Sequence, residues 1–328
     1  MINTIRIFIG NSFDPHYNLA VEKQLFDMVR PEECILYLWQ NQNTVVIGKS
    51  QNAWAECRTS LLESEGGKLA RRLSGGGAVF HDVGNLNFTF LVPSDHYDVD
   101  RQLSVIKEAC RLAGICVEKS GRNDLLAEGR KFSGNAFYHS SGRSYHHGTL
   151  MVNVDKDKLQ RYLSPPKAKL AAKGVASVRS RVVNLTELSP ALNIETMKQY
   201  MVQAFQTVYG LEASAVELSR EDLVTVEATA EEYRSWGYLY GTPLPFTFQC
   251  EEKFDWGYLQ LQLQAKNGMI QAVKVYTDAM DWSLAGQVEQ ALTGCKFRLQ
   301  DMRQALNNKL QDKTAADNLG QLLEKQEI

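Results

Sequence analysis

The chain has 328 residues, which is longer than a usual single domain and favours one large domain with a smaller one. Apolar residues make up 44% and charged residues 23%, as is typical of a soluble globular protein, and no run of about 18 apolar residues could span a bilayer. The formal net charge of −2 gives no overall attraction to nucleic acid, so anion binding would have to come from local clusters of cations.

The N-terminal part of the chain predicts both helix and strands. Its first apolar run, within MINTIRIFIG, is too short for the core of a signal peptide, which predicts a cytoplasmic protein. Val21, Leu25 and Val29 recur at the spacing of one helix face. The segments CILYLW at 34–39 and TVVIG at 44–48 are typical of strands.

The segment RRLSGGGAVFHD at 71–82 is the first candidate site. Glycines at 75 to 77 leave the backbone bare, so that it can approach a ligand closely and offer its N–H groups. The segment matches neither a Walker loop nor a dinucleotide-binding fingerprint. A tight turn or a bulge remains the alternative. Because adjacent side chains of an extended chain point in opposite directions, only one of Arg71 and Arg72 is expected to face a ligand.

The next segments predict a strand, a helix and a second candidate site. LNFTFLV at 86–92 alternates as in a strand buried on one face, and residues 101–113 have the spacing of an amphipathic helix. In GRNDLLAEGRKFSGNAFY, Lys131 is followed closely by Ser133 and Gly134, which add little bulk that could shield it from a docked ligand. A solvated turn lysine is the alternative. Asp124 could bind Mg²⁺ through its oxygens, or serve as a cap or ion-pair partner.

The histidines and a run of cations follow. His146 and His147 precede the predicted strand TLMVNV, and their rings should leave opposite faces, which argues against joint ligation of one metal ion. One of them is expected to line a pocket. For His81 two roles remain open, a structural hydrogen bond or catalysis. From Lys158 to Thr186 there are seven Lys and Arg residues and no Asp or Glu, which suggests either a mobile anion-binding segment or a basic surface.

A second domain is predicted after the proline-containing segment GTPLPFTFQC. We place the domains at 1–246 and 247–328. Alternating leucines around Asn267-Gly268 predict a hairpin with a type I′ turn, and one helix at 284–292 should be followed by one or two more. The six cysteines lack paired spacing, which argues against a zinc site, an iron–sulfur cluster and a disulfide framework.

Taken together, RRLSGGGAVFHD, GRNDL with GRKFSG, HHGTLMVN and KLAAKGVASVRSRVVNLTEL resemble the lipoate-protein ligase family, in its bacterial form with a C-terminal accessory domain. The resemblance runs from about residue 3 to the C-terminus and is strongest up to residue 190. It implies an α+β fold of the biotin/lipoyl ligase type, with mixed, mostly antiparallel sheets flanked by helices and a small α/β accessory domain. It also implies that lipoate and MgATP form lipoyl-AMP, whose acyl group is passed to a lysine of a lipoyl carrier domain. Such carriers are acyltransferase subunits of 2-oxo acid dehydrogenases and the H protein of glycine cleavage.

The resemblance assigns roles by position. Lys131 is the expected catalytic residue and contacts both the acyl carbonyl and the phosphate. The ATP and adenylate contacts implied by the match are Arg72, Gly77, Ala78, Val79, Phe80 and Lys131. The implied lipoate contacts are Ser74, Gly75, Gly76, Gly77, His81, Lys131 and His147. The implied adenylate loop, residues 167–184, contains Lys173, Gly174, Ser177, Val178 and Arg179, and Asp124 is the candidate magnesium ligand.

This chemistry explains why cations and glycines are needed together. A carboxylate and a triphosphate repel each other, and burying either without a partner is costly, so fixed positive charge must offset both. Lys131 could do so and later polarise the acyl carbonyl, without forming a covalent bond. Two alternatives remain open. One is a cysteine-dependent octanoyl or lipoyl transferase, although neither Cys110, on a predicted helix, nor Cys116, at a predicted strand start, is placed as a poised nucleophile. The other is a non-catalytic protein that binds carrier domains through residues 247–328.

Overall fold

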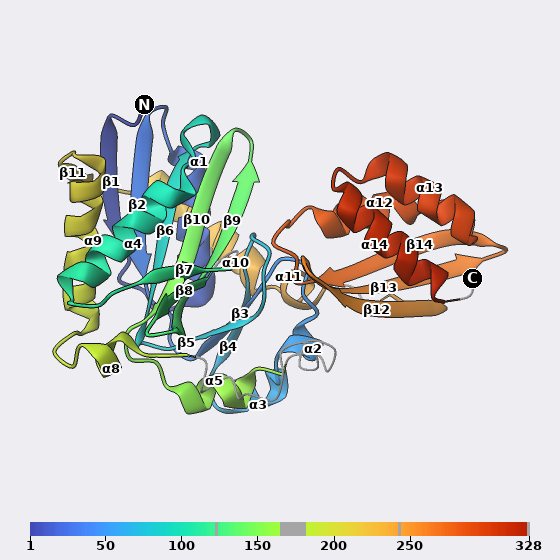
Figure 1. The fold of residues 1–328 in the computed structure, drawn as a ribbon, viewed down its shortest axis with the longest axis horizontal. Coiled ribbons are helices and arrows are strands. Elements are labelled where there is room, and N and C mark those ends of the chain that lie inside the picture. The colour runs from blue at the N-terminus through green and yellow to red at the C-terminus, as the bar shows by residue number, and fades with distance from the viewer. Residues whose placement is uncertain (122–123, 165–181, 242–243, 327–328) are drawn as a thin grey trace.

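The computed structural model describes residues 1–121, 124–164, 182–241 and 244–326, and Figure 1 shows two lobes of unequal size. The larger lobe is built on an eight-stranded sheet in the order β11-β1-β2-β6-β10-β9-β8-β7. Its strands are β1 (Thr4–Ile9), β2 (Glu33–Trp39), β6 (Asn85–Pro93), β7 (Glu118–Ser120), β8 (Asp124–Ala127), β9 (Arg130–Ser140), β10 (Arg143–Met151) and β11 (Ala213–Ala215). Strand β1 pairs in parallel with β11 and β2, whereas all other neighbours are antiparallel. This confirms the predicted α+β class with a mixed, mostly antiparallel sheet.

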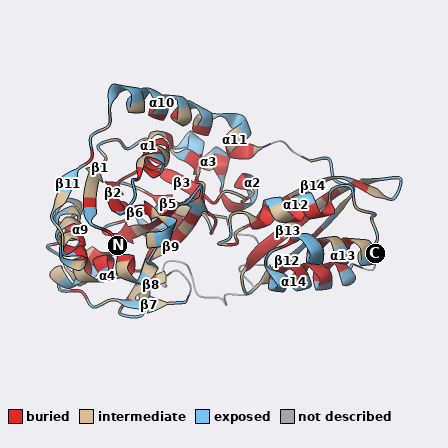
Figure 2. Cartoon of the chain, turned by 90° about the horizontal axis from the view of Figure 1, so that it is seen from above, coloured by how far each residue is buried: buried red, intermediate tan, exposed pale blue. Residues whose placement is uncertain are grey.

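Helices cover both faces of this sheet. On one face, α4 (Val99–Leu112) and α9 (Ile194–Tyr209) pack on the apolar side chains of β2 and β6. On the other face lie α1 (Pro15–Met28) and, packed on it, α10 (Arg220–Arg234), whose outer side is exposed (Figure 2). The prediction of one buried face for the segment 86–92 is wrong, because β6 is central and covered on both sides, so Asn87 and Thr89 are buried as well.

A small second sheet closes the larger lobe. It consists of β4 (Lys68–Arg71), β3 (Thr44–Ile47) and β5 (Val79–His81) in that order. Around it lie α2 (Ala53–Glu56), α3 (Thr59–Ser64), α5 (Lys156–Tyr162) and α11 (Trp236–Tyr240), which share one apolar core with it. The short helices η1 (Ser94–His96) and α8 (Leu185–Leu188) complete the described elements of this lobe. The glycine segment connects β4 to β5, the two outer strands, and so crosses the end of β3, where Lys49 N donates to the carbonyl oxygen of Ser74.

The C-terminal lobe has its own core. Strands β12 (Phe248–Phe254), β13 (Gly257–Lys266) and β14 (Met269–Thr277) form an antiparallel sheet in that order. Helices α12 (Leu284–Leu292), α13 (Leu299–Lys309) and α14 (Lys313–Glu324) pack on it and bury a separate apolar cluster. Asn267 and Gly268 have positive φ angles of 53° and 74°, which confirms the predicted type I′ hairpin turn.

Four of the six cysteines, at 34, 57, 110 and 250, are buried. Burial raises the pKa of the Cys110 thiol to about 12, so this side chain in the α4 core is a poor nucleophile. In the described part of the chain, we find no helix with the length and hydropathy needed to cross a membrane.

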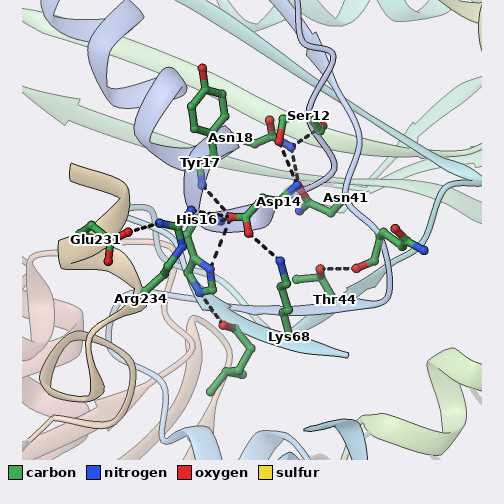
Figure 3. Close-up of polar contacts among 12 residues, drawn as sticks. Ser12, Asp14, His16, Tyr17, Asn18, Asn41, Thr44, Lys68, Glu231 and Arg234 are labelled. Atoms are coloured by element: carbon green, nitrogen blue, oxygen red, sulfur yellow. Dashed lines mark hydrogen bonds and ion pairs between the residues drawn. The ribbon is translucent and has the colours of Figure 1, made fainter. Parts of the chain in front are cut away.

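A polar cluster fixes the start of α1 against β4 and α10 (Figure 3). The carboxylate of Asp14 caps the helix by accepting from the backbone N–H groups of His16 and Tyr17, and also accepts from Lys68 Nζ at 2.6 Å. Burial raises the pKa of Asp14, but the hydrogen bonds from His16, Lys68 and Tyr17 outweigh it and hold the pKa well below its usual range.

We therefore expect Asp14→Asn, which keeps the cap and removes the charge, to lower the free energy of unfolding by about 1 kcal/mol at pH 7. Because the pKa of Asp14 is depressed in the folded state, its stabilising contribution is complete above the unfolded pKa near 3.8 and is lost as the pH falls below it. Urea unfolding of both proteins between pH 7 and pH 3.5 checks this. The difference should stay constant down to about pH 5 and then narrow, and a difference that widens on acidification would contradict the assignment.

Candidate active site

A cavity of about 600 Å³ lies between the large sheet, the small sheet and the C-terminal lobe. Its floor is a row of residues on five successive strands: Trp39 on β2, Asn87 on β6, Thr149 on β10, Gly134 on β9 and Asp124 on β8. Trp39 pairs with Asn87, Asn87 with Thr149, and Gly134 with Asp124, while Gly134 N donates to Thr149 Oγ1 at 3.2 Å. Paired residues share one face of a sheet, so the row forms one continuous surface.

Lys131 reaches this surface through a β-bulge. The register between β8 and β9 shifts by one residue between Leu125 and Leu126, which brings the side chain of Lys131 to the cavity. Its Nζ lies 2.6 Å from Asp124 Oδ1, and both side chains are about one-third exposed. A Cβ atom placed on Gly134 would be 3.1 Å from Nζ, so the absence of a side chain at 134 lets the ammonium lie across the strand. The two predicted polar residues thus come together as an ion pair on the cavity floor.

This geometry predicts that Gly134→Ala displaces the Lys131 ammonium, because the new methyl group occupies the space beside Nζ. Activity in the reaction proposed below should fall about tenfold or more, since small displacements of catalytic groups are costly. The free energy of unfolding should stay unchanged or rise by about 0.5 kcal/mol, because alanine restricts the unfolded chain more than glycine does.

Gly286→Ala, in open space on α12, is the matched control and should leave activity unchanged. Steady-state kinetics and urea unfolding of both variants make the comparison. Full activity of Gly134→Ala would show that the observed position of the ammonium is unimportant.

The guanidinium of Arg72 holds the glycine segment in place. Its Nε donates to Ser74 Oγ at 3.0 Å, its Nη2 to the carbonyl oxygens of Gly75 and Gly77 at 2.7 and 2.8 Å, and its Nη1 to that of Val46 at 3.2 Å. Burial lowers the pKa of Arg72 to about 10, which leaves the group charged at neutral pH. As expected from their alternation, Arg72 lines the cavity, whereas Arg71 donates to backbone carbonyls, including those of Tyr238 and Leu239.

The glycines face two different neighbours. Gly76 and Gly77 line the cavity together with Ala78 and Val79. At Gly75, by contrast, a Cβ atom would lie 2.2 Å from the carbonyl oxygen of Ala279 in the C-terminal lobe, and Gly76 N donates to that same oxygen at 3.0 Å. The bare backbone at 75 is therefore needed for contact between the two lobes, which the sequence analysis did not foresee.

Ser74, His147 and Glu22 form a buried chain of hydrogen bonds. His147 Nδ1 lies 2.8 Å from Glu22 Oε1, and its Nε2 lies 2.8 Å from Ser74 Oγ. These residue types in this order also occur in hydrolase triads. Here the serine is fully buried and its Oγ already accepts from Arg72, so the chain orients the glycine segment and does not present a nucleophile. Glu22 was not predicted as a site residue; the available signal was a carboxylate beside Val21 and Leu25 on the predicted helix face.

The rings of His146 and His147 lie on opposite faces of the sheet, as expected for neighbours on a strand. His147 and His81 line the cavity, whereas His146 points to the α4 side of the sheet, where Nδ1 lies 3.1 Å from Gln102 Oε1. Burial lowers the pKa of both His81 and His146 to about 3, so both rings are neutral. Phe80 does not face the cavity: its ring packs on Tyr162 in the core of the small sheet.

The adenylate-loop candidates Lys173, Gly174, Ser177, Val178 and Arg179 lie outside the described residues. Directly after them in the chain, Val182 pairs with Lys131, and Val183 N donates to the carbonyl oxygen of Lys131 at 2.9 Å. The chain that leaves the cation-rich segment therefore joins the strand that carries the catalytic candidate.

The C-terminal lobe contributes part of the cavity wall. Lys253 lines it from the end of β12, Asp255 and Trp256 from the β12–β13 turn, and Asp278 and Met280 from the connection between β14 and α12. Nothing in the local sequence pattern indicated these residues, because their position depends on how the two lobes pack. The C-terminal lobe therefore forms part of the candidate site.

Comparison with protein families gives two matches along the chain. Residues 14–206 match the lipoyl protein ligase A/B catalytic domain, and residues 244–324 match the bacterial lipoate protein ligase C-terminus. A curated protein from Bdellovibrio bacteriovorus, lipoate-protein ligase A, is 40% identical over 309 residues, which are 92% of this chain and 91% of that protein.

Solved structures agree with this likeness. The chain is similar to Plasmodium falciparum LipL1 in complex with lipoate, with a TM-score of 0.84 and 25% identity over 97% of this chain and 98% of that one. A bipartite lipoate protein ligase from Thermoplasma acidophilum, solved with its E2 lipoyl domain, has a TM-score of 0.65 and 22% identity over 76% of this chain and all of that one. At that identity, the second likeness supports the fold alone.

Proposed function

The chain belongs to the lipoyl protein ligase A/B family, and from that premise we propose that it is an ATP-dependent lipoate–protein ligase. In the first step, the lipoate carboxylate attacks the α-phosphate of ATP, which gives lipoyl-AMP and releases pyrophosphate. In the second step, a lysine amine of a carrier protein attacks the acyl carbonyl, and AMP leaves as an amide forms. The observation that carries the proposal is the ammonium of Lys131, which lies across Gly134 on the floor of a cavity bordered by the glycine segment.

Lys131 is the group we assign to both steps. Its only ion-pair partner among the described residues is Asp124. An incoming carboxylate and phosphate can replace that partner, so the ammonium would lie between two anions that otherwise repel each other. As charge moves from the carboxylate to the phosphate, the same cation stabilises both arrangements without moving far. In the second step it can stabilise the oxyanion that forms at the acyl carbonyl.

Asp124 is the residue we propose as the ligand of Mg²⁺. The described residues contain no group of three His, Cys, Asp or Glu side chains arranged to bind a metal. A single carboxylate fits Mg²⁺ nonetheless, because this ion is commonly bound by one or two carboxylates together with substrate phosphates and water. When bound, Mg²⁺ would neutralise phosphate charge. Asp124 is free to take this role once Lys131 has turned to the substrate.

We propose that the nucleotide lies along Gly77, Ala78 and Val79, which line the cavity beside Lys131. Arg72 lines the same cavity and keeps its positive charge at neutral pH, which would attract a phosphate. Phe80 would contribute its backbone alone, since its ring lies in the core. The division at residues 246 and 247 stays our proposal for the domain boundary, and the separate core of the C-terminal lobe supports it.

For the acceptor we propose lipoyl carrier domains, from 2-oxo acid dehydrogenase acyltransferase subunits, the glycine cleavage H protein, or both. The experiment measures pyrophosphate release by the purified chain with ATP, Mg²⁺ and lipoate. It then measures the mass of apo carrier domains after incubation with the same mixture. Lipoate-dependent pyrophosphate and a carrier heavier by one lipoyl group are the expected results. Absence of lipoate-dependent pyrophosphate would overturn the proposal.

A further inference from the structure

Two residues that line the cavity, His81 and Asn87, each carry a buried N–H donor without a partner among the described residues: His81 Nε2 and Asn87 Nδ2. Their residues are 3% and 1% exposed. An unpaired buried donor is costly, and natural proteins rarely keep one without a use.

The position of the proton on the His81 ring follows from the hydrogen bonds of Asn18 and Asn41. Asn18 Nδ2 donates to the carbonyl oxygens of Ser12 at 3.0 Å and Gln40 at 2.7 Å, which identifies this atom as nitrogen. Asn41 Oδ1 lies 3.0 Å from the same nitrogen, where an amide nitrogen would place two donors against each other, so Asn41 turns its Nδ2 toward His81 Nδ1, 3.1 Å away. Because burial keeps the His81 ring neutral, Nδ1 is the acceptor and Nε2 carries the hydrogen.

Asn87 is fixed in a similar way. Its Oδ1 accepts from Asn85 Nδ2 at 3.0 Å, which leaves its own Nδ2 as the unpaired donor. Asn87 is the cross-strand partner of Trp39, whose ring centroid lies 6.3 Å from that of His81. The two donors therefore belong to the same end of the cavity.

The sheet itself gives the distance between this end and Lys131. Gly134, which carries the Lys131 ammonium above it, lies on β9, and Asn87 lies on β6 with only β10 between them. Neighbouring strands are about 4.8 Å apart, so the two positions are separated by about 10 Å. This span is comparable to the extended acyl chain of lipoate. A carboxylate held at Lys131 thus brings the dithiolane ring to the two donors.

We propose that His81 and Asn87 select acyl chains that carry a hydrogen-bond acceptor at the far end, such as the sulfur atoms of lipoate. The inference rests on the function proposed above. Sulfur is a weak acceptor, but it gives the buried N–H groups a partner. A plain alkyl chain of the same length, octanoate, leaves both donors unpaired or must share the site with a trapped water. The site therefore favours lipoate over octanoate, because its two N–H donors are paired when lipoate is bound and unpaired when octanoate is bound.

The test compares kcat/KM for pyrophosphate release with lipoate and with octanoate in wild type, Asn87→Leu and His81→Phe. Each variant replaces a donor with an apolar group of similar size. The lipoate-to-octanoate ratio should fall about tenfold in each, through poorer use of lipoate and better use of octanoate. Thr149→Val, nearer to Lys131 on the same row, is the matched control and should change both acids alike. An unchanged ratio in both donor variants would overturn the inference.

A second measurement does not depend on the variants folding. Titration calorimetry of the wild type with each acid, without ATP, should give tighter binding of lipoate than of octanoate. Equal affinities would overturn the inference as well. Failure of the proposed function is distinguishable, because the wild type would then release no pyrophosphate with either acid while the two binding constants could still be compared.

Discussion

Lys131→Ala is expected to abolish detectable formation of lipoyl-AMP while leaving the protein folded. The side chain is about one-third exposed and its one described ion pair is with the partly exposed Asp124, so little stability depends on it. Its ammonium is the group we assign to charge stabilisation in both steps, and loss of such a donor costs about 10² to 10³ in rate. Pyrophosphate release and thermal unfolding of the variant measure the two effects separately.

Lys119→Ala is the matched control. Lys119 lies on β7 of the same sheet and forms an exposed ion pair with Asp100 at 3.1 Å, but it does not line the cavity. It should lose neither activity nor more than a few tenths of a kcal/mol of stability. A large drop in the melting temperature of Lys131→Ala, with activity retained, would show that Lys131 serves the fold and not the chemistry.

Arg72→Lys is expected to impair the use of both ATP and lipoate. Lysine cannot reproduce a planar group that donates to three backbone carbonyls and a hydroxyl at once, so the carbonyls of Val46, Gly75 and Gly77 would lose buried donors. The free energy of unfolding should fall by about 2–4 kcal/mol. Because the glycine segment then loses its shape along the cavity, the KM values for both substrates should rise together.

Arg71→Lys provides the comparison for this prediction. Arg71 also donates to several backbone carbonyls, but its side chain does not line the cavity. It should lose comparable stability while the two KM values change much less. If Arg72→Lys instead raises the KM for ATP alone and leaves stability unchanged, Arg72 acts on the phosphate and the glycine segment does not depend on it.

The local elements could be predicted from short-range pattern. Alternation and helical spacing located β2, β3 and α4, and Asn267-Gly268 identified the hairpin between β13 and β14 by the positive φ angles that such a turn requires. The segments that carry Arg72 and Lys131 were recognised because glycines and small residues beside a cation are unusual. None of this depends on how distant parts of the chain pack.

What could not be predicted depends on long-range pairing. The alternation of β6 places Asn87 on the polar side of a half-exposed strand, whereas in the structure it is a buried donor because both faces of this central strand are covered. Glu22 belongs to the site because of its hydrogen bond with His147, which lies 125 positions away in the chain. Gly75 looks like a ligand contact, yet its space is taken by Ala279 from the other lobe. In each case the missing information is a neighbour that sequence spacing does not supply.

The most direct test of the account is a crystal structure of the protein with a non-hydrolysable analogue of lipoyl-AMP. The account predicts the analogue in the cavity, with its acyl chain along the row from Gly134 to Asn87 and its phosphate near Gly77. Lys131 Nζ should have left Asp124 and lie within hydrogen-bond distance of both the acyl carbonyl and the phosphate. Density for the analogue at another site, or an ammonium that remains on Asp124 and turned away from the ligand, would contradict it.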